Sequence, residues 1–272
     1  MKRYSTLRQI PYTVLGIIFL GIMLFPVYWM LNTSLQSGPS AVSATLIPLH
    51  PSFTAYQQAI SAQLTNIGTS LLVAAGTVIV TLAIATPAAY ALAKFRFRWV
   101  NVILLALIIT QMIPSIVIAN ALYTAYNDLG LLNTIPGLVL ADASLSIPFA
   151  ILILRAFMLS IPSELIEAAR VDGAGQFRAF WSVVLPLSKN SIITAALFSF
   201  LFAWSDFLFA LTLTTGSSIR PVTLGIYSYL AGEVQSWGPV MATAVVASIP
   251  AIILLVFAQR YITAGALGGA LK

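Results

Sequence analysis

Six long apolar stretches constrain the fold of this chain more than any other feature of its sequence. Each is about as long as the roughly 20 residues that an α-helix needs to cross a bilayer, and they lie at 12–31, 69–93, 100–123, 136–158, 191–215 and 239–259. Of all residues, 60% are hydrophobic and only 7% are charged, so too few polar side chains remain to cover a water-soluble domain. The sequence predicts an all-α integral membrane protein with six transmembrane helices.

The basic residues predict the orientation of these helices. Of the 13 lysines and arginines, all but Arg220 fall on one side of the predicted spans. They are Lys2, Arg3, Arg8, Lys94, Arg96, Arg98, Arg155, Arg170, Arg178, Lys189, Arg260 and Lys272. Because cytoplasmic loops retain Lys and Arg, both termini are expected in the cytoplasm. The first apolar run exceeds the roughly 7–15 residues of a signal-peptide core, so we expect an uncleaved first helix.

The sequence also excludes several kinds of chemistry. It has no cysteine and a single histidine, His50, which removes disulfides, thiolate metal sites, multi-histidine zinc sites and ordinary Ser–His triads. A net charge of +6 reflects the basic loops of a membrane protein rather than a nucleic-acid partner. A membrane enzyme is therefore a weak interpretation, since the scattered acids assemble no evident catalytic group.

Small residues in the second span indicate helix packing. Ala85, Ala89 and Ala93 recur every four residues and so lie on one helical face, where small side chains let another helix approach closely. Chance in an alanine-rich helix is the alternative explanation.

The one large cytoplasmic segment, 161–190, reads as two short helices. Pro162, Ser163 and Glu164 form a helix-start signal, and Asp172-Gly173 is expected to break that helix because glycine tolerates turn conformations at low cost. An apolar face follows at i, i+3, i+4 and i+7, formed by Phe177, Phe180, Trp181 and Val184. Such a segment either docks into another protein or lies on the lipid headgroups as an amphipathic hairpin.

The motif in this segment resembles the EAA loop of permease subunits of binding-protein-dependent ABC importers. That loop reads Glu-Ala-Ala, three residues, Gly, nine residues, Ile, one residue, Leu-Pro. Here the matching residues are Glu167, Ala168, Ala169, Gly173, Val183, Leu185 and Pro186, with Val183 the one conservative departure. Further stretches resemble the carbohydrate-importer, maltose-permease-like branch, over roughly 11–270: 111–114, 130–134, 148–149, 161–162, 172–174, 202–204 and 259–265.

The resemblance implies one importer transmembrane domain, 1–272, in a bacterial or archaeal cytoplasmic membrane. Its partners would be a second homologous permease, two ATP-binding cassette subunits and an extracytoplasmic substrate-binding protein. The segment 161–190 would be the coupling loop, in which Glu167 makes the polar contact with an ATPase and Ala168, Ala169 and Gly173 permit close approach. Asp172 and Pro186 complete the expected coupling residues.

This chain is expected to bind no cofactor. It contains no Gly-x-x-x-x-Gly-Lys-Ser/Thr phosphate loop, so ATP and magnesium are expected in the partner ATPases, and no nucleic acid is expected.

Polar side chains within predicted spans are candidates for the transport path, because such groups are costly at membrane depth. Asp206 and Trp204 pair an acid with an aromatic ring, which suits a sugar; a structural hydrogen bond is the alternative. At position 205 the family usually has asparagine, whereas this chain has Ser205. Serine has no side-chain amide, so an amide contact with the substrate at this position is in question. Gln111 and Asn120 on the third span line the path or bond neighbouring helices. Pro114 is expected to kink that span, and Asp142 is expected near the outer end of the fourth, where it can reach the headgroups.

The sequence thus predicts the permease subunit of an ATP-driven sugar importer that works by alternating access. A glycerol-phosphate or polyol importer is the nearest alternative. An ATPase-independent channel or secondary transporter is the alternative from another class, and in that protein the segment 161–190 would be incidental.

Overall fold

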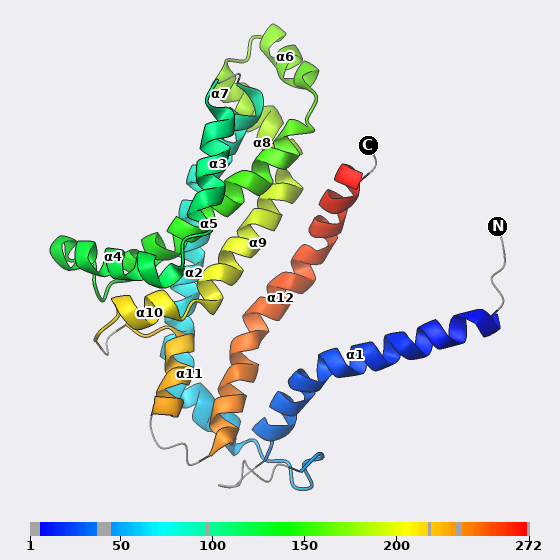
Figure 1. The fold of residues 1–272 in the computed structure, drawn as a ribbon, viewed down its shortest axis with the longest axis vertical. Helices are drawn as coiled ribbons and strands as arrows, with labels where there is room; N and C mark the ends of the chain where they lie inside the picture. The colour runs from blue at the N-terminus through cyan, green and yellow to red at the C-terminus, as the bar shows by residue number, and fades with distance from the viewer. Residues whose placement is uncertain (1–5, 37–44, 96–97, 217–218, 232–235, 271–272) are drawn as a thin grey trace. The chain divides into compact units, whose positions relative to one another are not determined.

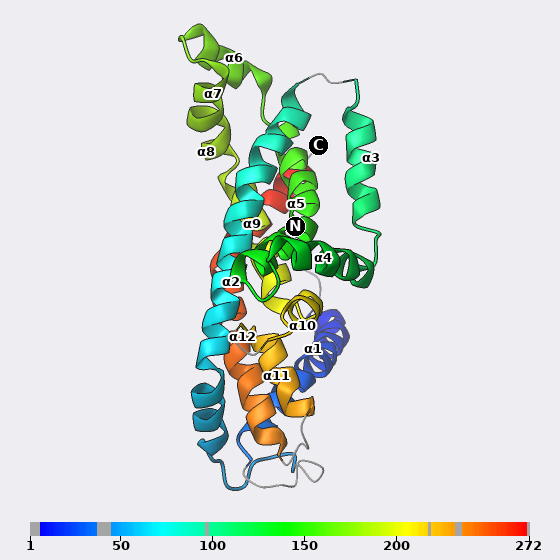
Figure 2. The same ribbon diagram turned by 90° about the vertical axis from the view of Figure 1, so that its left-hand side faces the viewer.

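The computed structural model describes residues 6–36, 45–95, 98–216, 219–231 and 236–270, and all of its regular elements in these ranges are helical (Figure 1 and Figure 2). The elements are α1 (Thr6–Ser34), α2 (Thr54–Lys94), α3 (Val100–Thr110), α4 (Ser115–Leu129), α5 (Ile135–Leu159), α6 (Ser163–Val171), α7 (Gln176–Ala179), the π-helical turn η2 (Phe180–Val184), α8 (Leu185–Leu187), α9 (Lys189–Ser205), α10 (Leu208–Leu213), α11 (Val222–Ala231) and α12 (Trp237–Ala270). Lys2, Arg3, Arg96 and Lys272, which entered the orientation prediction, lie outside the described residues.

The helices confirm the predicted all-α membrane fold. Four are long and apolar enough to cross a membrane, and the number rises to six if each of two bent helix pairs counts as one span, within the described residues. The four are Pro11–Ser34, Thr54–Lys94, Ile135–Leu159 and Trp237–Tyr261. The cytoplasmic position of the termini stays a prediction.

The third predicted span is not one kinked helix. α3 and α4 meet at 92° across the break before Ser115, far more than the kink expected from Pro114. Pro114 adopts an extended backbone with φ −57° and ψ 130°, and proline disfavours the helical conformation of the residue before it. The helix therefore stops and restarts in a new direction.

The second bent pair comprises Gln176–Leu187 and Lys189–Ser205, which meet at 77°. The fifth predicted span, 191–215, is itself interrupted further along. α9 ends at Ser205, Asp206 is extended with φ −63° and ψ 131°, and the short helix α10 follows. The segment 216–237, expected as an outer loop, contains α11.

The chain divides into two compact units, of which the first comprises residues 1–64 and 226–249. Its small core contains Ala55, Ala59 and Ala242. The C-terminal end of α1 is fastened by polar contacts: Asn32 donates from Nδ2 to the carbonyl of Thr45 at 2.7 Å, and the hydroxyls of Ser34 and Tyr56 lie 2.6 Å apart.

The second unit comprises residues 65–225 and 250–272 and contains two apolar clusters. One joins α2, α5, η2 and α9, and its buried members include Ala89, Leu154 and Val184. The other joins α2, α4, α5 and α10 around the fully buried Phe209. These clusters hold the candidate sites described below.

Small residues let α2 approach α5, as predicted. Ala85 and Ala89 are fully buried and Ala93 is partly buried in the same cluster. One turn after another towards the N-terminus, Thr81 and Thr77 are also fully buried. A Cβ atom on Gly76 would lie 2.7 Å from Cγ2 of Val139, so the closest approach requires a glycine.

The α4–α5 turn shows why the stretch 130–134 has its sequence. Gly130 ends α4 in the left-handed conformation, with φ +67°, and Thr134 begins α5 by accepting a hydrogen bond from the backbone N–H of Gly137 at 3.0 Å. Between them, Asn133 adopts φ +58° and bonds the segment after α10 through its side chain. One asparagine thus joins two turns that are far apart in the sequence.

Candidate functional site

The coupling loop, residues 161–190, begins with α6 and turns at Gly173. Gly173 has φ +86°, and the N–H groups of Gly173 and Ala174 donate to the carbonyls of Arg170 and Ala169 at 3.1 Å and 2.9 Å. This is the Schellman arrangement that closes a helix on a left-handed residue. The predicted break at Asp172-Gly173 is confirmed, and the loop projects from one end of the second unit (Figure 1).

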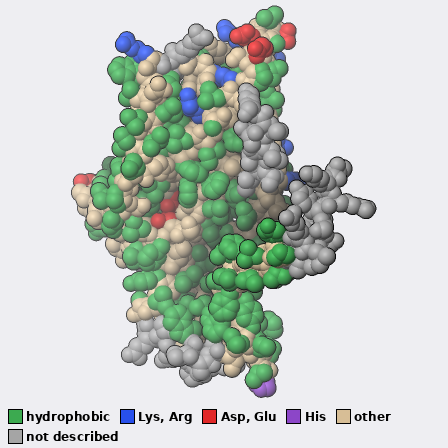
Figure 3. Space-filling model, turned by 45° about the vertical axis from the view of Figure 1, so that its right-hand side comes forward, with side chains coloured by type: hydrophobic (Ala, Val, Ile, Leu, Met, Phe, Trp, Pro, Cys, Tyr) green, Lys and Arg blue, Asp and Glu red, His purple; other side chains and the backbone are tan. Residues whose placement is uncertain are grey.

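In the structure, Glu167 lines the same pocket as two cations of its own chain. Glu167 and Arg170 of α6 line a polar pocket of about 270 Å³ together with Lys94 at the end of α2 and Gln176 of α7. Glu167, Ala168, Asp172, Gly173 and Pro186 are exposed, whereas Ala169 is partly buried. On the face shown in Figure 3, many of the charged side chains lie toward this end, a few acidic atoms lie about half-way down, and most of the remaining side chains are hydrophobic.

The predicted apolar face of the second loop helix is divided. Phe180 and Val184 are buried in the cluster of α2, α5 and α9, whereas Phe177 and Trp181 are 76% and 57% exposed. The prediction of one face was wrong because α7 continues into the π-helical turn η2, and a π-turn changes the register of a helix. Phe180 and Val184 therefore anchor the loop to the helices, whereas Phe177 and Trp181 remain exposed on its surface.

Exposed apolar side chains cover much of the loop. Phe177 and Trp181 pack edge to face at 6.0 Å, and Val171 at the end of α6 is 87% exposed. Exposed apolar groups gathered in this way are typical of protein–protein contact surfaces.

Asp206 stabilises the break between α9 and α10. Its carboxylate accepts hydrogen bonds from the backbone N–H groups of Phe209 at 3.2 Å and Ala210 at 3.0 Å, as a helix-capping residue does. Its carbonyl accepts from Thr223 Oγ1 at 2.6 Å. This cap directs Phe209 into the apolar cluster.

The other path candidates lie on different elements. Trp204 is buried and stacks on Phe200 at 5.4 Å. Gln111, at the α3–α4 break, donates from Nε2 to the carbonyl of Leu145 on α5 at 3.1 Å. Asn120 is exposed on α4, next to Ala119, which packs in the cluster that contains Phe209.

Asp142, which the sequence places near the outer end of the fourth span, is buried in α5 with 4% of its surface exposed. Ser146, one turn further on, is fully buried. Asp142 and Ser146 lie one helical turn apart on a mostly apolar helix, and this spacing is the sequence signal that could have revealed a polar position inside the bundle.

Comparison with known proteins identifies the family. Residues 83–266 match the family described as binding-protein-dependent transport system inner membrane component. The chain belongs to this family. It is therefore a multi-pass permease subunit of an ABC importer in the cytoplasmic membrane, which works with an ATPase and a substrate-binding protein, and the ATPase hydrolyses ATP.

The permease resembles several known proteins over nearly its full length. It is 34% identical to the trehalose transport system permease protein SugB of Mycobacterium tuberculosis, covering 97% of this chain and 98% of that protein. It is 31% identical to the diacetylchitobiose uptake system permease protein DasC of Streptomyces coelicolor, covering 100% of both. A bacterial ABC transporter that imports the acidic polysaccharide alginate contains a chain of the same fold, with a TM-score of 0.81, 25% identity, and coverage of 96% of this chain and 99% of that chain.

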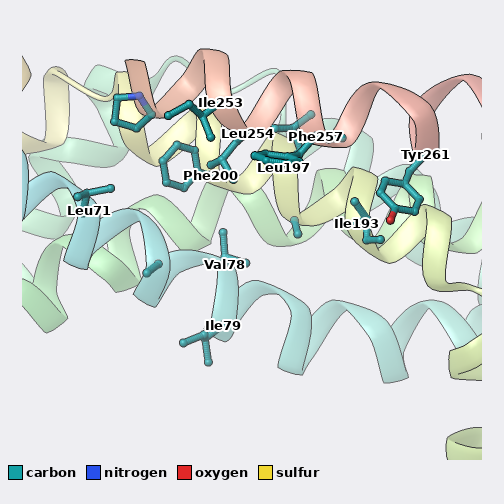
Figure 4. A pocket seen from close by; sticks show the side chains of 14 residues that line it. Leu71, Val78, Ile79, Ile193, Leu197, Phe200, Ile253, Leu254, Phe257 and Tyr261 are labelled. Atoms are coloured by element: carbon teal, nitrogen blue, oxygen red, sulfur yellow. The ribbon is translucent and has the colours of Figure 1, made fainter. Parts of the chain in front are cut away.

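The permease also has a groove of about 760 Å³ between α2, α9 and α12. Figure 4 shows Val78 of α2, Phe200 of α9 and Leu254 of α12 among its lining, with Tyr261 at one end beside Ile193. Apart from the hydroxyl of Tyr261, the lining side chains are apolar. Such a lining offers almost nothing to the hydroxyl groups of a sugar.

Proposed function

We propose that this permease imports a sugar, either an oligosaccharide or a sugar derivative, by alternating access. The substrates named for its relatives carry the proposal: SugB is a trehalose permease and DasC a diacetylchitobiose permease, each similar to this chain almost from end to end. No lysine or arginine lies deep in a predicted span, which suits a neutral solute better than a polyol phosphate.

The working complex would contain this permease, a second homologous permease, two ATPase subunits and the binding protein. Both termini and the coupling loop would lie in the cytoplasm, as the distribution of basic residues predicts. All 272 residues would form one transmembrane domain. ATP and magnesium would bind only to the ATPases, since this chain has no phosphate loop.

The coupling loop would seat in a cleft of one ATPase. The exposed Val171, Phe177 and Trp181 supply the apolar contact, and the exposed Glu167 supplies a polar one. Ala168, Ala169 and Gly173 permit close approach, while Asp172 and Pro186 bound the turn and the end of the loop. Phe180 and Val184 of the loop are buried against α2, α5 and α9. A movement of the loop by the ATPase would therefore be transmitted to these membrane-spanning helices.

The path would take its polar groups from two broken spans. Gln111 and Asn120 offer side-chain amides at the α3–α4 break and on α4, and Trp204 and Asp206 shape the wall at the α9–α10 junction. Asp206→Asn tests this role, because asparagine also caps helices well. We expect the free energy of unfolding of this variant to lie within about 0.5 kcal/mol of the wild-type value, while substrate uptake is reduced. Unchanged uptake would show that Asp206 acts only as a helix cap.

Reconstitution tests the main proposal. The complex of permeases, ATPases and binding protein is placed in proteoliposomes, and uptake of labelled trehalose, diacetylchitobiose and glycerol 3-phosphate is measured with and without ATP. We expect uptake of a sugar that requires ATP, the ATPases and the binding protein. Uptake that persists without the ATPases would overturn the importer mechanism, and uptake of glycerol 3-phosphate alone would replace the substrate class.

A matched pair of variants tests the coupling loop. Glu167→Ala is expected to reduce ATP-driven uptake about tenfold, as the loss of one charge-assisted hydrogen bond at an interface would. Asp128→Ala removes an exposed acid of α4, outside the coupling loop, and is expected to change uptake by less than about twofold. Equal effects of the two variants would show that net charge, rather than the contact of Glu167, matters.

A further inference from the structure

Two cations at the root of the coupling loop bind backbone carbonyls in a crossed arrangement. Arg155, in the last turns of α5, donates from Nε to the carbonyl of Leu92 in the last turn of α2 at 3.1 Å. Lys94, the last residue of α2, donates from Nζ to the carbonyl of Ile161 just after α5 at 2.5 Å. Thus α5 supplies the cation that binds a carbonyl in the last turn of α2, and α2 supplies the cation that binds a carbonyl just after the end of α5.

Both bonds are favourable because a hydrogen bond from an ionised donor is stronger than a neutral one. Leu92 also lies in the last turn of α2, where the carbonyls lack intrahelical partners and carry partial negative charge. Lys94 and Arg155 are partly buried, so solvent screens these bonds less than bonds on an open surface.

The position of the crossed bonds matters for the loop. Ile161 directly precedes Pro162 and α6, so the bond from Lys94 holds the point where the chain leaves α5. At the other end of the loop, Phe180 packs on Tyr90 of α2 at 5.1 Å between ring centres. The loop therefore has a polar attachment at its entry and an apolar attachment at its exit, and both involve the last turns of α2.

We propose that Lys94 and Arg155 are positioning residues that form a clasp: Lys94 holds the start of the coupling loop to α2 and Arg155 holds α5 to α2, so that force on the loop moves both helices together. The proposal rests on the proposed function, in which an ATPase moves this loop. It adds a mechanical role to two residues that the sequence marks only as cytoplasmic charges.

A role in topology alone predicts something different. If Lys94 served only as a positive charge on the cytoplasmic side, Arg98 in the same connecting segment would be its equal. Arg98 is exposed and lies over the ring of Trp99 at 5.7 Å. Arg98→Met is therefore the matched control for Lys94→Met, because both remove one charge from the same segment.

A distance measurement tests the clasp without reference to transport. The chain contains no cysteine, so spin labels can be placed only at introduced cysteines: Val171→Cys on exposed α6 and Ile84→Cys on an exposed face of α2. In the full-length chain in nanodiscs, we expect the distance distribution to broaden in Lys94→Met and in Arg155→Met, but not in Arg98→Met. Distributions of equal width in all four proteins would overturn the clasp.

A coupling measurement tests what the clasp does. In the reconstituted complex, ATP hydrolysed per sugar imported is expected to rise at least about threefold in Lys94→Met and Arg155→Met, since one charge-assisted hydrogen bond is lost in each, and to stay unchanged in Arg98→Met. If a Met variant fails to assemble, Lys94→Gln or Arg155→Gln keeps a neutral donor and takes its place. If the spin-label distance distributions broaden but the ATP hydrolysed per sugar imported does not change, the proposed role of the two residues in coupling would be overturned. A wild-type complex without ATP-driven uptake would instead refute the proposed function, and the distances would still decide whether the clasp exists.

Discussion

The helices α1 and α5 have nearly the same mean hydropathy but very different surroundings. None of the most apolar part of α1 is buried within the described chain, whereas 61% of the corresponding part of α5 is. Apolar content therefore predicts that a helix enters the membrane, but it does not predict which helix packs against its own chain.

Side-chain size explains the difference. The middle of α1 carries large exposed side chains such as Ile17, Ile18 and Phe19, and nothing lies within 4 Å of a Cβ atom built on Gly16. By contrast, α5 buries a run of small residues: Ala141, Ala143, Ser146 and Ala150. Small residues let helices approach in a membrane, where van der Waals packing replaces the hydrophobic driving force. The exposed face of α1 suits lipid or the proposed second permease.

The largest expected effect separates α5 from α1 directly. Leu154→Ala removes a fully buried side chain of α5 and is expected to reduce the free energy of unfolding by about 2–5 kcal/mol. Leu20→Ala on α1, where leucine is 56% exposed, is expected to cost less than about 0.5 kcal/mol. Tryptophan fluorescence during unfolding in mixed micelles measures both; equal losses would show that α1 packs within the chain.

A second prediction concerns the close approach of α2 to α5. Gly76→Val is expected to cost about 1–3 kcal/mol because the new side chain meets Val139. Gly68→Val on the same helix has nothing within 4 Å and should be nearly neutral in the same unfolding assay. A neutral Gly76→Val would mean that the two helices can separate at no cost.

The smallest effect sharpens the account of α1, whose C-terminal end is buried although its middle is not. Tyr56→Phe removes the hydroxyl–hydroxyl bond and is expected to cost about 1 kcal/mol. Ser34→Ala removes this bond together with the bond from Ser34 Oγ to the carbonyl of Leu31 and is expected to cost somewhat more. The double variant should cost little more than Ser34→Ala alone. If the losses in the free energy of unfolding of the two single variants were fully additive in the double variant, this would contradict a hydrogen bond between Ser34 and Tyr56.

Some elements were predictable because their limits are local. The span predicted at 136–158 is observed as Ile135–Leu159, since the Thr134 cap and Pro136 mark its start. The full extent of the two breaks was not predictable, because the apolar sequence resumes directly after Gln111–Pro114 and because the Asp206 cap depends on a carboxylate meeting two N–H groups.

The candidate site was predictable in a similar, partial way. The Gly173 turn follows from glycine itself. The bonds of Lys94 and Arg155 cannot be predicted in this way. Every residue has a backbone carbonyl, and the sequence does not indicate which carbonyl a given lysine or arginine will bind. The division between Phe177 and Phe180 depends on a π-turn, which leaves no mark in the spacing of apolar residues.

The π-turn η2 limits how this chain can change during evolution. Removing one residue from Phe180–Val184 would turn it into an ordinary helical turn and rotate everything before it by about 100°. Phe177 and Trp181 would then face a different direction while Val184 kept its place. Lineages of this permease should therefore tolerate exchanges of side chains in η2 far more readily than a change in its length.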